Sequence, residues 1–234
     1  MNKKNKRHKE NSAKIEDKLY TLNAAVELVL QLKAPKFVES IDLNFRLGID
    51  TKKADQAVRA TVALPHGTGK KIRVLVFATG TDADAAKEAG ADFVGYEDFV
   101  QKVKDGWTDF DIAIATPATM REVGKIGRIL GPRGLMPSPK AGTVTQDVGK
   151  AVTEFKSGKV EFRADKQAGI HCPVGKVNFK AEQIVENIKA LLGAILKSKP
   201  SASKGTYLQK ISISTTMGPG IRIDPHDAET QAME

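Results

Sequence analysis

Residues 210–224, KISISTTMGPGIRID, contain the strand on which our interpretation of the whole chain depends. Ser212 and Ser214 alternate with isoleucines, which predicts one apolar face and one face of small hydroxyls. The strand should stop at MGPG, residues 217–220, because proline lacks a backbone donor and glycine weakens a ladder. A strand of this kind cannot bury its apolar face alone, so we expect a partner strand of the same pattern.

The matching pattern lies near the other end of the chain, in ESIDLNFRLGID at residues 39–50. Every second residue from Ile41 to Leu47 is apolar, and the residues between them are polar or charged. We therefore predict that the two ends of the chain meet in one sheet. The middle of the chain is then an insertion between them.

The pattern of the inserted middle is different. After the turn-rich PHGTGKK at 65–71, the predicted strands are nearly unbroken apolar runs, at 72–78, 91–94 and 111–115. The predicted helices cover 81–89, 97–104, 119–129 and 145–156, and the first has Thr81 and Asp84 at capping-box spacing. Strands that do not alternate, each followed by a helix, indicate a parallel sheet covered on both faces. A loop rich in glycine and proline is expected at 131–142.

The alternating pattern returns after Gly158, with predicted strands near 160–165 and 169–179 and a helix at 182–196. Near the N-terminus we expect a helix at 21–33 and a strand at 57–64. The predicted fold class is α/β: a split α+β two-layer domain with a mainly antiparallel sheet, interrupted by an inserted Rossmann-like parallel α/β domain. The expected limits are residues 1–67 with 159–234 for the split domain and 68–158 for the insert.

The charge of the chain indicates an anionic partner. Its 234 residues include 37 Lys and Arg against 28 Asp and Glu, a formal net charge of +9 at pH 7. Nucleic acid is the first candidate partner and a membrane surface the second. Aromatic residues make up only 6% of the chain, which argues against stacking on single-stranded bases and favours recognition of folded RNA by phosphate contacts and shape.

Cysteine usage and hydropathy indicate the compartment. The single Cys172 excludes an internal disulfide and fits a reducing environment. No apolar run reaches transmembrane length, and no apolar segment follows the charged N-terminus as it would in a secretory signal. We expect a cytoplasmic protein with no membrane partner.

Residues 1–18 form a polar, basic N-terminal segment that includes Lys3, Lys4, Lys6, Arg7, His8 and Lys9. It fits a solvated, frayed tail and an arm that contacts phosphates equally well. The sequence leaves both interpretations open.

No catalytic constellation withstands inspection. GTGK at 67–70 lacks the first glycine of a phosphate-binding loop, and Lys71 stands where Ser or Thr would bind magnesium. VFATG at 76–80 has one glycine where a dinucleotide fold has three. His171 and Cys172 are neighbours on a strand and point to opposite faces, so they cannot act as base and nucleophile. We therefore predict no enzyme, no catalytic residue, no metal site and no cofactor.

Two sets of residues are candidates for RNA contact. Lys36 and Phe37 lead into the first strand, Lys166 and Lys176 bracket the later hairpin, and TMG at 216–218 closes the last strand. Small hydroxyls and bare backbone suit contact with ribose hydroxyls and phosphates, and Phe37 or Met217 suits packing against a base or sugar, although Phe37 fits a core position as well. The second set is a basic loop in the insert, with Arg128, Arg133 and Lys140. Each residue, taken singly, also fits a purely structural or solvated position.

Five segments resemble the bacterial large ribosomal subunit protein L-one family, the ribosomal stalk family. They are FVESIDLNFRLGID (37–50), LPHGTGK (64–70), GRILGPRGLMPSPKAGTV (127–144), IHCPVGK (170–176) and STTMGPG (214–220). The resemblance implies a ribosome-bound structural protein whose split domain binds large-subunit rRNA at the mobile stalk. It also implies assistance in releasing deacylated tRNA from the exit site, repression of its own operon mRNA, and a monomeric free protein.

The RNA-contacting positions of that family correspond here to Lys36, Phe37, Ser40, Asp165, Lys166, Gly169, His171, Lys176, Thr216, Met217 and Gly218. Ser40 stands where threonine is frequent in the family, which keeps the hydroxyl, and Cys172 stands where alanine is frequent. Residues 228–234 extend past the usual end of the family and are expected to be disordered. Two alternatives stay open from the residues themselves: a nucleotide-dependent enzyme built on the insert, and a nonspecific basic nucleic-acid binder.

Overall fold

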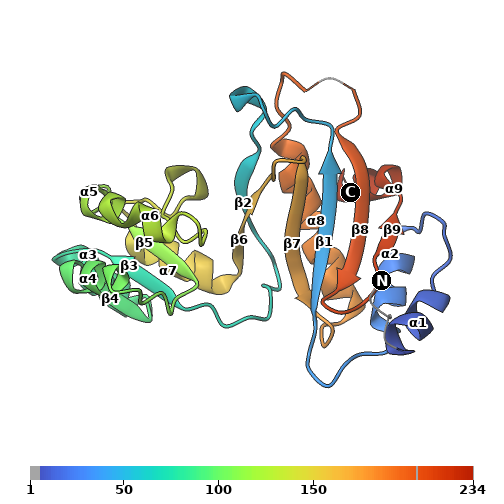
Figure 1. Cartoon of the computed structure of the whole chain (residues 1–234), viewed down its shortest axis with the longest axis horizontal. Coiled ribbons are helices and arrows are strands. Elements are labelled where there is room, and N and C mark those ends of the chain that lie inside the picture. The colour runs from blue at the N-terminus through green and yellow to red at the C-terminus, as the bar shows by residue number, and fades with distance from the viewer. Residues whose placement is uncertain (1–5, 204, 234) are drawn as a thin grey trace. The chain divides into compact units, whose positions relative to one another are not determined.

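The computed structural model describes residues 6–203 and 205–233. The chain divides into two compact units (Figure 1): unit 1 is Met1–Gly69 with Val160–Glu234, and unit 2 is Lys70–Lys159. Both ends of the chain thus belong to one unit. The domain limits that we expected, 67/68 and 158/159, stay a prediction.

A four-stranded antiparallel sheet organises unit 1, in the order β7-β1-β8-β9. Its strands are β1 (Ser40–Leu47), β7 (Gly169–Lys176), β8 (Leu208–Thr215) and β9 (Ile221–Ile223). Strand β1 lies between β7 and β8, and its Leu43 is paired with Cys172 on one side and Ile213 on the other. The prediction that the two ends of the chain meet in one sheet is confirmed.

The last predicted strand, 210–224, is two strands joined by a turn. β8 ends at Thr215, and β9 then folds back to pair antiparallel with β8, with Ile213 opposite Ile221. The turn is closed by Gly218 N–H, which donates to Thr215 O at 3.1 Å. The alternating pattern alone did not predict this turn, because β8 and β9 place their isoleucines on the same buried face.

Three helices cover one face of the sheet: α2 (Leu22–Leu30), α8 (Ala181–Lys197) and α9 (Pro225–Met233), as Figure 1 shows. Their apolar residues and those of the strands form one core, in which Leu22, Leu43, Ile188 and Ile213 are fully buried. The other face of the sheet carries the polar residues of the alternating pattern. None of the helices in 6–203 and 205–233 has the length and apolar character needed to cross a membrane.

The C-terminal residues are helical, so the expected disorder of 228–234 is wrong for the part that the structure describes; Glu234 lies outside it. Ala228 of α9 is fully buried in the core. Asp227 Oδ2 accepts a hydrogen bond of 2.8 Å from Leu22 N–H, one of the free donors at the start of α2. Helix α9 therefore owes its order to contacts with residues about 200 positions earlier.

Residues 6–13 are also ordered, as helix α1 (Lys6–Ala13), so a frayed tail is the wrong interpretation for this part. Lys3 and Lys4 lie outside the described residues. The buried Asn11 fixes α1 to the segment after α2, since its amide both donates to and accepts from the backbone of Lys33.

A second, two-stranded sheet of β2 (Arg59–Ala63) and β6 (Lys159–Arg163) completes unit 1. A 3₁₀ turn, η1 (Ala54–Gln56), precedes it. Val62 and Phe162 bury their side chains in the core of unit 1, and Arg59 pairs with Glu161 across the strands.

Unit 2 is a three-stranded parallel sheet in the order β4-β3-β5, which confirms the predicted Rossmann-like α/β class. Its strands are β3 (Val74–Phe77), β4 (Phe93–Gly95) and β5 (Ile112–Ala115). Its longer helices are α3 (Thr81–Glu88), α4 (Glu97–Lys104) and α7 (Val148–Ser157). Two separate hydrophobic clusters lie against opposite faces of β3, one with Leu75 and Phe77 and the other with Val74 and Val76.

Two local predictions in unit 2 are wrong. The helix expected at 119–129 is three short segments, α5 (Met120–Val123), η2 (Gly124–Ile126) and α6 (Gly127–Leu130). Thr81 is the first helical residue of α3 and not its cap, because Gly80 occupies that position with a φ of 61°, a conformation open to glycine. The expected Gly/Pro-rich loop holds only a 3₁₀ turn, η3 (Pro139–Ala141).

Candidate nucleic-acid interface

One end of the main sheet brings together seven of the predicted contact residues. Because β1 and β8 are antiparallel, the start of β1 lies beside the end of β8. The Thr216 hydroxyl accepts a hydrogen bond of 3.1 Å from Ser40 N–H, and Thr216 N–H donates to Ser40 O at 3.1 Å. We call this end the Met217 corner and define it by Lys36, Phe37, Ser40, Lys176, Thr216, Met217 and Gly218.

The Met217 corner, together with the adjoining Val38, exposes large apolar side chains. Phe37 is 52% exposed, Val38 55% and Met217 53%, a concentration that a monomeric surface rarely shows without a binding role. The basic Lys36 is exposed beside them, and Lys176 is paired with Ser40 across β7 and β1. The corner thus combines apolar contact area, positive charge and hydroxyls.

One hydrogen bond to a buried carboxylate and one close backbone approach fix the conformation of the corner. The Glu39 carboxylate, itself only 3% exposed, accepts a hydrogen bond of 2.7 Å from Met217 N–H. Gly218 admits no side chain, because a Cβ there would lie 2.3 Å from the Thr215 hydroxyl. The backbone of Met217 is therefore fixed by the Glu39 carboxylate, and the Met217 side chain stays exposed.

Asp165, Lys166 and Gly169, three of the remaining predicted residues, lie toward the other end of the sheet. Asp165 Oδ1 accepts from Gly169 N–H at 2.7 Å and from Gln167 N–H at 2.8 Å, so the Asp165 carboxylate closes this turn. The hydrogen bond from Gly169 lowers the pKa of the Asp165 carboxyl below its ordinary value. Lys166 is exposed at the tip of the turn.

His171 lies on the open face, between these two ends. Its Nδ1 is 2.7 Å from Asn44 Oδ1, and its Nε2 is 3.7 Å from Asp165 Oδ2. The register places His171, Asn44, Ser212 and Arg222 opposite one another across β7, β1, β8 and β9.

The structure places further polar residues on this face that the sequence did not single out as candidates for RNA contact. Asn44 and Asp42 lie on β1 between the two ends, and Arg222 lies at the edge on β9. Burial raises the pKa of the Asp42 carboxyl, and the nearby His171 offsets part of the shift. Alternation at 39–50 shows which residues share a face, but only the register shows which residues of other strands are their neighbours.

The predicted basic loop belongs to unit 2. Arg128 on α6, Arg133 and Lys140 are all exposed. Arg133 Nη1 donates to the Thr108 hydroxyl, and within the described residues none of the three forms an ion pair. The loop therefore presents three positive charges without carboxylate partners.

The structure gives the enzyme motifs no catalytic geometry. Burial raises the pKa of the Cys172 thiol to about 12, so it stays protonated at neutral pH, and it lies on the face of β7 opposite His171. The Gly67 carbonyl accepts from the Asn187 amide at 2.9 Å, which ties the GTGK segment to helix α8. Within 6–203 and 205–233, no three His, Cys, Asp or Glu side chains form a group that would hold a metal ion.

Comparison with known proteins identifies the family. The family model described as "Ribosomal protein L1p/L10e family" matches residues 29–219, which include every residue of the Met217 corner and all of unit 2. The chain belongs to the ribosomal protein L1p/L10e family. The large ribosomal subunit protein uL1 of Renibacterium salmoninarum is 56% identical to it over 227 residues, 97% of each chain.

Membership in this family confirms the resemblance seen in the sequence. The chain is a structural, non-enzymatic constituent of the large ribosomal subunit, a role that implies binding to its rRNA and a place on cytoplasmic ribosomes. The nucleotide-dependent enzyme, which the sequence left open, is excluded with it.

Proposed function

We propose that the open face of the main sheet, from the Met217 corner to the Asp165 turn, binds the stalk region of the large-subunit rRNA. The observation that carries this proposal is the corner itself, where three exposed apolar side chains, exposed lysine and ordered hydroxyls come together. Folded RNA is recognised through its ribose hydroxyls, phosphates and splayed bases, and this surface offers a partner for each.

Some of these residues contact RNA directly, and others hold the surface in its conformation. Lys36, Lys166 and Lys176 are placed to contact phosphates, while Phe37 and Met217 are placed to pack on a sugar or base. Asp165, Gly169 and Gly218 act indirectly, because their hydrogen bonds or lack of side chain fix the turns. A surface ordered before binding loses less conformational entropy when RNA arrives.

Further roles follow from the same surface and from the family resemblance. A face that reads the shape of folded RNA also fits a messenger that folds like the rRNA site, which supports repression of the protein's own operon mRNA. Arg128, Arg133 and Lys140 of unit 2 are exposed and, within the described residues, form no ion pair; they suit contact with a second RNA, which supports assistance in releasing exit-site tRNA. We propose that the free protein is a monomer, which sedimentation analysis tests.

The sharpest test of the interface uses two exposed methionines. Met217→Ala should weaken binding to transcribed stalk RNA by about tenfold, the scale of one well-packed contact, without lowering the melting temperature. Met136→Ala, at the exposed methionine of the unit 2 loop, is the matched control and should leave affinity unchanged. Filter binding at fixed salt measures both.

Two results would contradict the proposal. Unchanged affinity in Met217→Ala would show that the corner is not part of the interface. Equal affinity of the unaltered protein for stalk RNA and an unrelated duplex, with steep salt dependence, would instead show a nonspecific basic binder.

A further inference from the structure

The N-terminal helix α1 is fixed against unit 1 by a buried side chain. Asn11 is 2% exposed, and its amide donates to Lys33 O at 3.1 Å and accepts from Lys33 N–H at 3.0 Å. The Glu10 carboxylate adds an ion pair of 3.0 Å with the Lys33 ammonium. Since both polar atoms of the Asn11 amide are used, α1 has one defined position on the unit.

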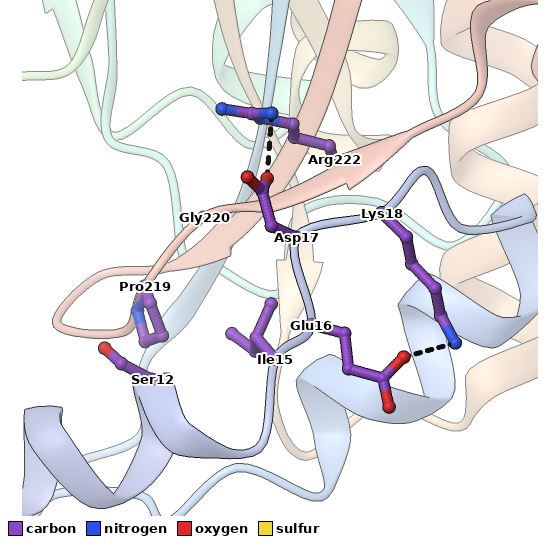
Figure 2. Close-up of a pocket in the computed structure, with 8 residues that line it drawn as sticks. All are labelled: Ser12, Ile15, Glu16, Asp17, Lys18, Pro219, Gly220 and Arg222. Carbon is purple, nitrogen blue, oxygen red and sulfur yellow. Dashed lines mark hydrogen bonds and ion pairs between the residues drawn. The ribbon is translucent and has the colours of Figure 1, made fainter.

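That position is beside both segments of the Met217 corner. Lys33 lies three residues before Lys36 in the segment that leads into β1. Figure 2 shows the chain after α1 passing the β8–β9 turn, and a hollow of about 230 Å³ between them is lined by Ser12, Ile15, Pro219 and Gly220 among others. Pro219 directly follows Gly218 of the corner.

Acidic residues in this segment are neutralised within the protein. Glu10 pairs with Lys33, Glu16 with Lys18 at 2.6 Å, and Asp17 with Arg222 at 3.0 Å; Figure 2 shows the last two pairs. These three are all the carboxylates between residues 6 and 18.

The basic residues of α1 itself are not neutralised in this way. Among the residues that the structure describes, Lys6, Arg7 and Lys9 form no ion pair. Lys6 and Lys9 are exposed, and Arg7 is half-buried. Helix α1, which Asn11 anchors to the segment leading into the Met217 corner, therefore carries three positive charges that a polyanion can neutralise.

We propose that α1 is a docked arm of the RNA interface, whose Lys6, Arg7 and Lys9 contact phosphates of the RNA bound at the Met217 corner. This inference rests on the proposed function. Complementary charge and continuity with the corner single out RNA backbone as the occupant. A helix already held by Asn11 loses less entropy on binding than a flexible tail would lose.

The test removes the charge of the arm and leaves its helix intact. Lys6→Gln, Arg7→Gln and Lys9→Gln are combined, because Gln has nearly the helix propensity of Lys and Arg. Each phosphate contact contributes about 0.9 to the slope of log affinity against log salt concentration. Loss of three contacts should therefore reduce the magnitude of this slope by about two to three. Affinity for stalk RNA near 0.1 M salt should fall by about tenfold to several hundredfold.

A charge-matched control separates an arm from a general loss of positive charge. Lys189→Gln, Lys197→Gln and Lys199→Gln remove the same charge at or just after α8, the helix that covers the opposite face of the sheet. This control should change the affinity by less than about threefold. If the α1 variant and the control lose affinity to the same extent, the proposal that α1 contacts the RNA is wrong.

Two further variants distinguish the arm from the interface on which it rests. Loss of affinity in Met217→Ala with none in the α1 variant would overturn the arm and leave the proposed function standing. Full affinity in both variants would contradict the proposed interface as well as the arm. Asn11→Ala, which releases α1, should reduce affinity by about two- to tenfold with little change in slope; unchanged affinity would overturn the docked form of the arm.

Discussion

The two sheets of this protein differ in how many faces they bury. Buried and more exposed residues alternate along β1 of unit 1, whereas all four residues of β3 in unit 2 are buried. Among the described residues, the first sheet has helices on one face only, and the second sheet has a hydrophobic cluster on each face. Because unit 1 leaves a whole face open, its strands can bind a ligand directly, while unit 2 must act through its loops.

The largest expected effect tests this difference in stability. On β8, Ile213→Ala should cost about 2–5 kcal/mol of unfolding free energy, and its neighbour Ser212→Ala less than about 0.5 kcal/mol, because only Ile213 faces the core. On β3, Leu75→Ala and Val76→Ala should each cost more than about 1 kcal/mol, because both faces are packed.

Urea unfolding measures these four variants, followed by circular dichroism for the whole chain and by fluorescence of Trp107, the single tryptophan, for unit 2. If Ser212→Ala destabilises unit 1 as much as Ile213→Ala, the open face is not open. If Leu75 and Val76 differ as strongly as Ile213 and Ser212, the two sheets are alike.

A smaller effect concerns two carboxylates of the open face whose pKa values shift in opposite directions. Burial raises the folded pKa of Asp42 above its ordinary 3.8, so its ionisation costs stability as pH rises through the folded value. Hydrogen bonds from the backbone lower the folded pKa of Asp165, so its stabilisation is present above 3.8 and is lost as pH falls through the lowered value.

Asp42→Asn should therefore be more stable than the unaltered protein at pH 7, and Asp165→Asn less stable. The Asp42 difference should shrink as pH falls from its raised folded pKa toward 3.8, and the Asp165 difference should shrink only as pH falls below 3.8 toward its lowered folded pKa. Urea unfolding across this range is the measurement. A stabilised Asp42→Asn that binds stalk RNA more weakly would show that the open face favours binding over stability; a destabilised one would contradict the stated cause of its pKa shift.

The smallest expected effect is on RNA affinity when unit 2 is removed. Residues 70–159 are replaced by a short Gly–Ser linker, which leaves the whole main sheet and its helices in place. We expect the remaining chain to fold and to bind stalk RNA within about threefold of the full protein, since the proposed interface lies in unit 1. A product that folds but does not bind stalk RNA would show that the main interface lies in unit 2 and not on the open face of unit 1.

Local spacing predicted much of this structure. Alternation at 41–47 predicted β1 and its buried face, and the apolar runs predicted the parallel strands of unit 2. The helix expected at 97–104 is α4, residue for residue. These predictions succeed because residues two, three or four apart on one element must share a face.

Part of the proposed interface was predictable for the same reason. Residues 216–218 close a recognisable strand end, so they were predicted from the residues themselves, whereas Ser40 was implied only by the family resemblance. Asn44 was missed, because its place beside His171 depends on the register of two strands more than 120 residues apart in sequence.

The sequence by itself thus determined the identity of most elements, the buried face of each, and the meeting of the two chain ends. Tertiary structure alone decided the order of α1 and α9, the reversal between β8 and β9, and the rows of side chains across the open face. Asn11 with Lys33, Asp227 with Leu22 and Glu39 with Met217 hold these features. Each is a hydrogen bond between residues distant in sequence. Such a bond produces no periodic pattern of residues, so it cannot be predicted from local spacing.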